Sequence, residues 1–94
     1  MDSEKLASQQ ALGDAAKSLR ENPFLQQFMA SARQAVIDTW ATSDLHDIEG
    51  QRMCRLALRA QENFQQALET AIANGTFADE QLRQLADTKE AASG

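Results

Sequence analysis

The chain has 94 residues and a mass of 10.3 kDa, and it carries a net charge of −5. It contains 17 alanines and 11 glutamines but only four valines and isoleucines together. This composition excludes a sheet-rich fold and predicts one small helical domain, and the acidic balance predicts neither a nucleic-acid partner nor a membrane partner.

The amino-terminal segment is polar and acidic, whereas a signal peptide would be basic and then apolar. No apolar run approaches the ~18 residues that a membrane span needs. Cys54 is the only cysteine, so the chain cannot form an internal disulfide. We therefore expect a cytoplasmic protein.

Residues 3–20 are the first expected helix, with Ser3 as its N-cap. Gly13 weakens the middle of this segment, and Leu6 lies away from its main apolar face. That face consists of Leu12, Ala16 and Leu19. We expect this helix to need another surface on which to dock.

Asn22-Pro23 is the clearest boundary, because asparagine caps helices well and proline suits the first helical position. The helix that it opens should reach about residue 41. Its apolar positions recur at spacings of three and four, and they are Phe24, Phe28, Ala32, Ala35, Val36, Thr39 and Trp40. We expect the aromatic residues in this row to lie in the core and not on a base-stacking platform.

A polar link over residues 42–47 precedes a long helix over about 45–73. Asn74-Gly75 suits a C-terminal cap, so we expect this helix to end there. Its apolar row is Met53, Leu56, Ala57, Ala60, Phe64, Ala67, Leu68, Ala71 and Ile72. Gly50, in its first turn, is expected to allow a close approach by Trp40, so that Gly50→Leu would destabilise the fold.

Thr76 and Asp79 resemble a capping box and predict a short fourth helix, with Phe77 covering the end of the bundle. The expected fold is therefore all-α and forms one domain over residues 1–94, with frayed ends at 1–3 and 90–94. It is a small bundle in which an antiparallel hairpin is flanked by shorter N- and C-terminal helices. The two helices of the hairpin cover residues 23–41 and 45–73.

The length of the third helix bears on self-association. At 1.5 Å per residue it measures about 43 Å, whereas a compact domain of this size is only about 30 Å across. Apolar positions also lie outside its main face and that of the second helix, namely Ile37, Cys54, Leu58 and Ile72. Either the first and fourth helices cover these positions, or the protein is a homo-oligomer that buries them between copies.

Few residues could carry catalysis or bind a metal. His46 and Glu49 share a helical face, but two ligands do not make a metal site. Cys54 lies eight residues from His46, too far for that histidine to activate it. The sequence predicts no catalytic residue, no metal and no cofactor.

Three arginines, Arg52, Arg55 and Arg59, fall within about 60° on one helix face. With Arg33, they are candidates for binding the phosphates of a small anionic nucleotide, because guanidinium groups bind phosphates bidentately. The alternative is a solvated face in which Glu49 and Glu62 form ion pairs with the arginines at a spacing of three.

Residues 40–42 read Trp-Ala-Thr, residues 47–52 read Asp-Ile-Glu-Gly-Gln-Arg, and a helix with spaced Leu and Phe residues follows as far as Gly75. This pattern resembles small helical proteins of tailed bacteriophages and prophages, encoded near head and packaging genes. The resemblance covers about residues 24–85, and Gln51 departs from it by separating the glycine from the arginine. It implies a phage origin and a helical hairpin, and it implies no catalytic residue.

The leading functional hypothesis is a non-enzymatic, self-associating interaction protein, a phage accessory or head-assembly factor. It would act in the host cytoplasm or enter the virion, with copies of itself or another phage or host protein as partner. The first alternative is a counter-defence protein that sequesters a small anionic nucleotide through the arginines. The second is a small DNA-binding packaging subunit, which the net charge disfavours.

Overall fold

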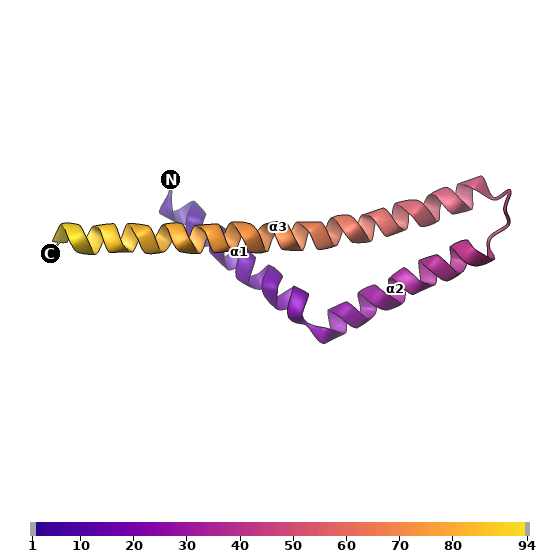
Figure 1. Ribbon diagram of the computed structural model, residues 1–94, viewed down its shortest axis with the longest axis horizontal. Coiled ribbons are helices and arrows are strands. Elements are labelled where there is room, and N and C mark those ends of the chain that lie inside the picture. The colour runs from indigo at the N-terminus through magenta and orange to yellow at the C-terminus, as the bar shows by residue number, and fades with distance from the viewer. Residues whose placement is uncertain (1, 94) are drawn as a thin grey trace. The chain divides into compact units, whose positions relative to one another are not determined.

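The computed structural model of the protein describes residues 2–93, and these residues form three α-helices and no strand (Figure 1). The helices are α1 (Ser3–Glu21), α2 (Pro23–Thr42) and α3 (Ile48–Ser93). The prediction of an all-α protein is confirmed. Met1 and Gly94, which belong to the ends expected to fray, lie outside the described residues.

Contacts divide the chain into two compact units. Unit 1 combines residues 1–19 with residues 68–94, so it contains most of α1 and the C-terminal part of α3. Unit 2 covers residues 20–67, so it contains α2 and the first part of α3.

The starts of α1 and α2 follow capping rules. Asn22 is the N-cap of α2, because its Oδ1 accepts hydrogen bonds from the backbone N–H groups of Phe24 at 2.8 Å and Leu25 at 3.3 Å. This boundary is confirmed. The cap of α1 is Asp2 and not Ser3, since Asp2 Oδ1 accepts from the N–H of Glu4 at 3.1 Å.

Asp47 caps α3. Its Oδ1 accepts from the N–H of Gly50 at 2.9 Å, and its carbonyl oxygen accepts from the N–H of Gln51 at 3.0 Å. A Cβ on Gly50 would collide with the Asp47 carboxylate and would not meet Trp40 among its nearest neighbours. Gly50 thus leaves room for the capping side chain, and the expected close approach of Trp40 stays a prediction.

Three expectations about Asn74-Gly75 and the residues after it are wrong, because α3 runs unbroken to Ser93. Gly75 is not a left-handed cap, since no described residue has a positive φ. Thr76 does not cap a new helix, because its hydroxyl donates to the Ile72 carbonyl at 3.1 Å within α3. Phe77 covers no bundle end, because it lies within α3 with 48% of its surface exposed.

The core of unit 1 forms where α1 crosses α3 (Figure 1). Its buried residues are Leu6, Gly13 and Ala16 on α1 and Gly75 and Ala78 on α3. Their spacings of three and seven place each set on one helix face. The expected position of Leu6 outside the packed face is wrong, since only 1% of its surface is exposed, whereas Leu12 is 63% exposed.

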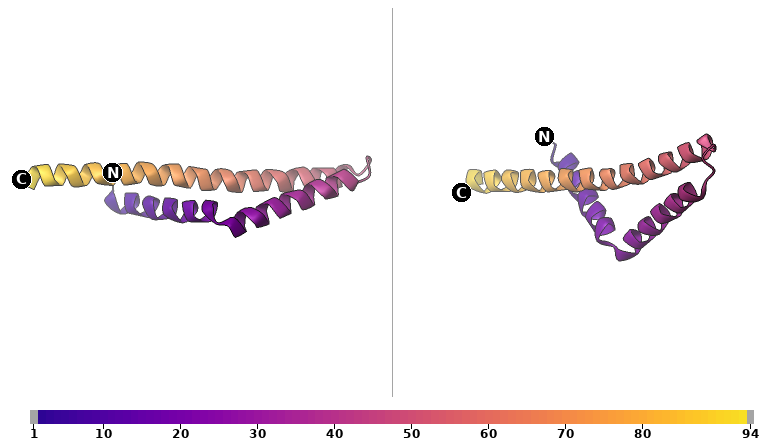
Figure 2. Two further views of the ribbon diagram at one scale, coloured as in Figure 1. Left: turned by 60° about the horizontal axis from the view of Figure 1, so that its bottom comes forward. Right: turned by 45° about the vertical axis from the view of Figure 1, so that its right-hand side comes forward.

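In unit 2, α2 and the first part of α3 run in opposite directions from the segment that joins them, and they diverge away from it (Figures 1 and 2). Cys54 is the buried residue of this unit. Because α2 diverges from α3 toward Pro23, Phe24 and Phe28 remain 66% and 70% exposed. The expectation that these two residues lie in a core is therefore wrong. The same expectation is wrong for Trp40, which is 57% exposed, and for Phe64, which is 42% exposed. The expected small bundle, in which an antiparallel hairpin is flanked by shorter helices, is not confirmed.

Candidate functional site

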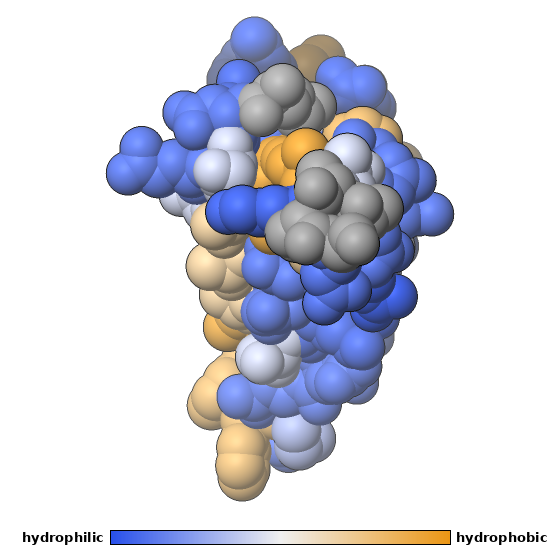
Figure 3. Space-filling model, turned by 90° about the vertical axis from the view of Figure 1, so that its left-hand side faces the viewer, coloured by the Kyte–Doolittle hydropathy of each residue, from blue (hydrophilic) through white to orange (hydrophobic). Residues whose placement is uncertain are grey.

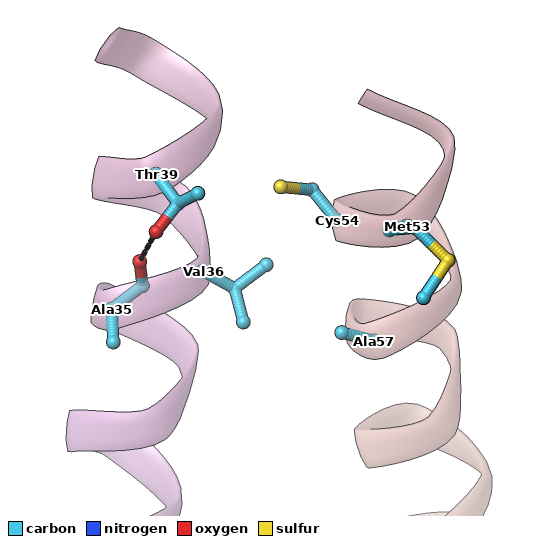
Figure 4. Close-up of a pocket in the computed structure, with 6 residues that line it drawn as sticks. All are labelled: Ala35, Val36, Thr39, Met53, Cys54 and Ala57. Atoms are coloured by element: carbon cyan, nitrogen blue, oxygen red, sulfur yellow. Dashed lines mark hydrogen bonds between the residues drawn. The ribbon is translucent and has the colours of Figure 1, made fainter. Parts of the chain in front are cut away.

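A shallow apolar pocket of about 260 Å³ lies between α2 and α3 in unit 2. Its lining residues are Ala35, Val36 and Thr39 from α2 and Met53, Cys54 and Ala57 from α3. Val36, Cys54 and Ala57 point into the space between the helices (Figure 4). The Thr39 hydroxyl donates to the Ala35 carbonyl oxygen at 2.8 Å, so its hydrogen-bond donor is already used within α2.

Exposed apolar side chains extend from this pocket along both helices. Figure 3, which views the molecule from the end at which α3 terminates, shows apolar residues, in orange, at the surface among hydrophilic ones. We define the apolar face of unit 2 as two rows of exposed residues: Phe24, Phe28, Ala32, Ala35 and Thr39 on α2, and Met53, Leu56, Ala60 and Phe64 on α3. Spacings of three and four keep each row on one side of its helix. The two rows meet at the pocket, to which Ala35, Thr39 and Met53 all contribute.

The size of the exposed side chains sets this face apart. Phe24, Phe28 and Met53 are each more than 60% exposed, and Leu56 and Phe64 are 50% and 42% exposed. Single exposed apolar residues are ordinary on protein surfaces, but contiguous large ones mark interaction sites. None of the nine residues of the face is charged.

The residues expected from the sequence to form an interaction surface lie elsewhere. Cys54 is buried, with 7% of its surface exposed, and lines the pocket from within the space between α2 and α3. Ile37 and Leu58, also in unit 2, are partly buried. Ile72 is partly buried in unit 1.

The arginines expected to bind anions are all exposed side chains of unit 2. Arg52, Arg55 and Arg59 share one face of α3, because spacings of three and four bring them into line on a continuous helix. Arg33 lies on α2, so it belongs to a different helix.

The expected ion pairs of these arginines with Glu49 and Glu62 do not form. Within residues 2–90, where side chains are described, the one ion pair at short range that involves an arginine of α3 is between Arg83 and Asp79, at 3.0 Å. The three guanidinium groups of the row are thus left open to solvent and to anions. Exposed arginines gain little from a single anion, because water and salt screen the attraction.

No group of three or more His, Cys, Asp or Glu side chains in the described part of the chain could hold a metal ion. His46 is exposed in the segment between α2 and α3, and its backbone N–H donates to Asp44 Oδ1 at 2.8 Å. Among the helices described, none is long and apolar enough to cross a membrane.

Spacing predicted one row on α2 that contained Val36 and Trp40 besides the five α2 residues of the apolar face, and it assigned the whole row to the core. No signal in the sequence could have corrected this assignment, because spacing along α2 does not show which side of the helix faces α3. In the structure Val36 and Cys54 face each other across the pocket (Figure 4). Comparisons with protein-family models, with curated proteins and with solved structures find no match to this chain.

Proposed function

We propose that this chain is a non-enzymatic, self-associating interaction protein that works in the cytoplasm. One observation carries the proposal, namely the uncharged apolar face of unit 2, with Phe24 and Phe28 66% and 70% exposed. Leaving such side chains in water forgoes roughly 25 cal/mol for each Å² of apolar surface, which association would recover.

Light scattering coupled to size exclusion tests this proposal on the full chain. We expect the apparent mass to rise above 10.3 kDa as the loading concentration rises through the micromolar range. Leu56→Gln, on the apolar face, should weaken this association. Leu12→Gln is the matched control, because Leu12 is 63% exposed on α1, outside the apolar face. A strict monomer at tens of micromolar would overturn the proposal.

A narrower form of the proposal assigns the protein to phage head assembly or packaging. In that role it would either act in the host cytoplasm or become part of the virion. This narrower form is supported by the resemblance around Trp40 and residues 47–52. Genes for a portal or a terminase next to the coding sequence would support this role. A neighbourhood of unrelated host genes would count against it.

The second candidate function is binding of a small anionic nucleotide. It is favoured by the row of Arg52, Arg55 and Arg59, whose expected pairing with Glu49 and Glu62 is absent from the described side chains. Association would strengthen this site if it brought the rows of two copies together. Thermal shift against a panel of linear and cyclic nucleotides tests it. Stabilisation that disappears in the Arg55→Gln variant would support it, and no stabilisation at millimolar nucleotide would exclude it.

A further inference from the structure

The pocket of unit 2 has the size and lining to hold one aromatic ring. Its volume is about 260 Å³, whereas an apolar cavity of about 150 Å³ is enough to bind benzene and sites for drug-sized ligands begin at about 300 Å³. Its six lining residues include no charged side chain. Its one hydroxyl, that of Thr39, donates within α2. An apolar ring therefore suits this pocket better than a polar metabolite does.

Phe28 supplies such a ring on the same surface. It is 70% exposed, and it lies on the α2 row that also contains the pocket residues Ala35 and Thr39. Seven residues separate Phe28 from Ala35, which is about 10.5 Å along a helix. That separation is too long for the side chain to reach the pocket of its own chain. The ring can enter the pocket only from another molecule.

The spacing of ring and pocket along α2 is self-complementary. We propose that a second copy of the chain docks antiparallel on the apolar face, each copy inserting its Phe28 ring into the pocket of the other. Ala32 lies between Phe28 and the pocket residue Val36, four residues from each, so a two-fold axis near Ala32 would bring both rings to both pockets. The small side chain at this position lets the two α2 helices approach closely. This inference rests on the proposed function, self-association, and specifies its geometry.

The available surface suits a second copy. An aromatic side chain can bury roughly 150–250 Å², so the large exposed residues of the face would together contribute on the order of 500 Å² per copy. A symmetric pair would then bury on the order of 1,000 Å², which is close to the lower limit for a specific interface. Because no residue of the face is charged, two identical faces can meet without repulsion between like charges.

Two variants remove the two halves of the contact. Phe28→Ala removes the ring, and Ala57→Leu fills the pocket, because the Ala57 side chain points into it (Figure 4) and leucine is also a good helix former. Each should raise the dimer dissociation constant by about tenfold or more, because every dimer would lose both of its ring contacts. Matched controls are Phe77→Ala, on a phenylalanine outside the face, and Ala30→Leu, on an exposed alanine of α2 outside the face. Both controls should associate like the unmodified chain.

Mixing the two variants tests the reciprocity. The Phe28→Ala chain keeps an open pocket, and the Ala57→Leu chain keeps its ring, so a mixed dimer regains one of the two contacts. Native mass spectrometry separates the three dimers by mass. We expect the mixture to form a mixed dimer at concentrations at which neither variant alone forms a dimer. Absence of an excess of the mixed dimer would overturn the reciprocal insertion.

The outcomes separate this inference from the proposed function. If the unmodified chain stays monomeric, the proposed function and this inference fail together. If it associates and both variants associate equally well, self-association stands and the ring-in-pocket geometry is wrong. Far-ultraviolet circular dichroism of each variant confirms that its helices remain folded, so weakened association reports on the interface.

Discussion

Gly13 of α1 lies against Gly75 of α3 with no room for a side chain between them. A Cβ on Gly13 would lie 2.7 Å from the Gly75 Cα and 2.9 Å from the Ala71 carbonyl oxygen. A Cβ on Gly75 would in turn lie 2.8 Å from the Gly13 Cα. These atoms belong to the two backbones and cannot rotate aside, so the close approach of α1 and α3 depends on both glycines.

Gly13→Ala should therefore lower the stability of unit 1. Alanine favours a helix over glycine by about 0.5–1 kcal/mol, but forcing apart two packed helices costs about 1–3 kcal/mol. We expect the second effect to prevail and the midpoint of thermal unfolding to fall by several degrees, as measured by circular dichroism. Ser18→Ala, at an exposed position of the same helix, should not lower the midpoint. A higher midpoint for Gly13→Ala would contradict the close approach.

The same glycine pair shows where prediction from sequence reached its limit. Asn74-Gly75 is a favourable pair for ending a helix, and local rules cannot reveal that α1 buries Gly75. Glycine at a helix crossing and glycine at a helix end give the same signal in a single sequence. The Asn22-Pro23 boundary was predictable because its cause is local, namely a side-chain cap and a proline that needs no hydrogen bond.

The candidate site was predicted less well than the helices. Spacing along α2 identifies the row that contains Phe24 and Phe28, but it cannot specify which side of α2 faces α3. In the structure Val36 faces Cys54, and the phenylalanines stay exposed because the helices diverge toward Pro23. Which face of an amphipathic helix meets its neighbour depends on the tertiary fold, which periodicity alone does not contain.

Asp47 and Gly50 should be coupled in stability. Asp47→Ala removes the cap of α3 and should cost about 1 kcal/mol, whereas Asp47→Asn should cost little because asparagine also caps well. Gly50→Ala places a Cβ 2.7 Å from the Asp47 Cγ, so it should displace the capping carboxylate. The loss of the cap should then offset most of the stability that alanine adds through its higher helix propensity. In the Asp47→Ala background the same change should stabilise by about 0.5–1 kcal/mol. Urea unfolding of the four chains measures this coupling, and additive effects would contradict it.

Asp79 makes two contacts that should differ in strength. It accepts a hydrogen bond from Gln10 Nε2 at 2.6 Å in a partly buried position between α1 and α3. It also forms an ion pair with Arg83, whose side chain is 78% exposed. Gln10→Ala should cost about 1 kcal/mol of the free energy of unfolding, whereas Arg83→Ala should change it by less than about 0.5 kcal/mol. Equal losses in urea unfolding would show that the exposed pair is stronger than its position implies.

The thiol of Cys54 should report on the opening of unit 2. This side chain is 7% exposed and points toward Val36 (Figure 4), so an alkylating reagent should react with it more readily when α2 moves away from α3. We expect alkylation of the native chain to be much slower than alkylation in urea, as followed by mass spectrometry. Val36→Ala should speed the native reaction by about threefold to tenfold, because it removes packing that holds the helices together. Leu12→Ala, at an exposed position of unit 1, should leave the rate unchanged. A native rate equal to that in urea would mean that the space between α2 and α3 is open to solvent.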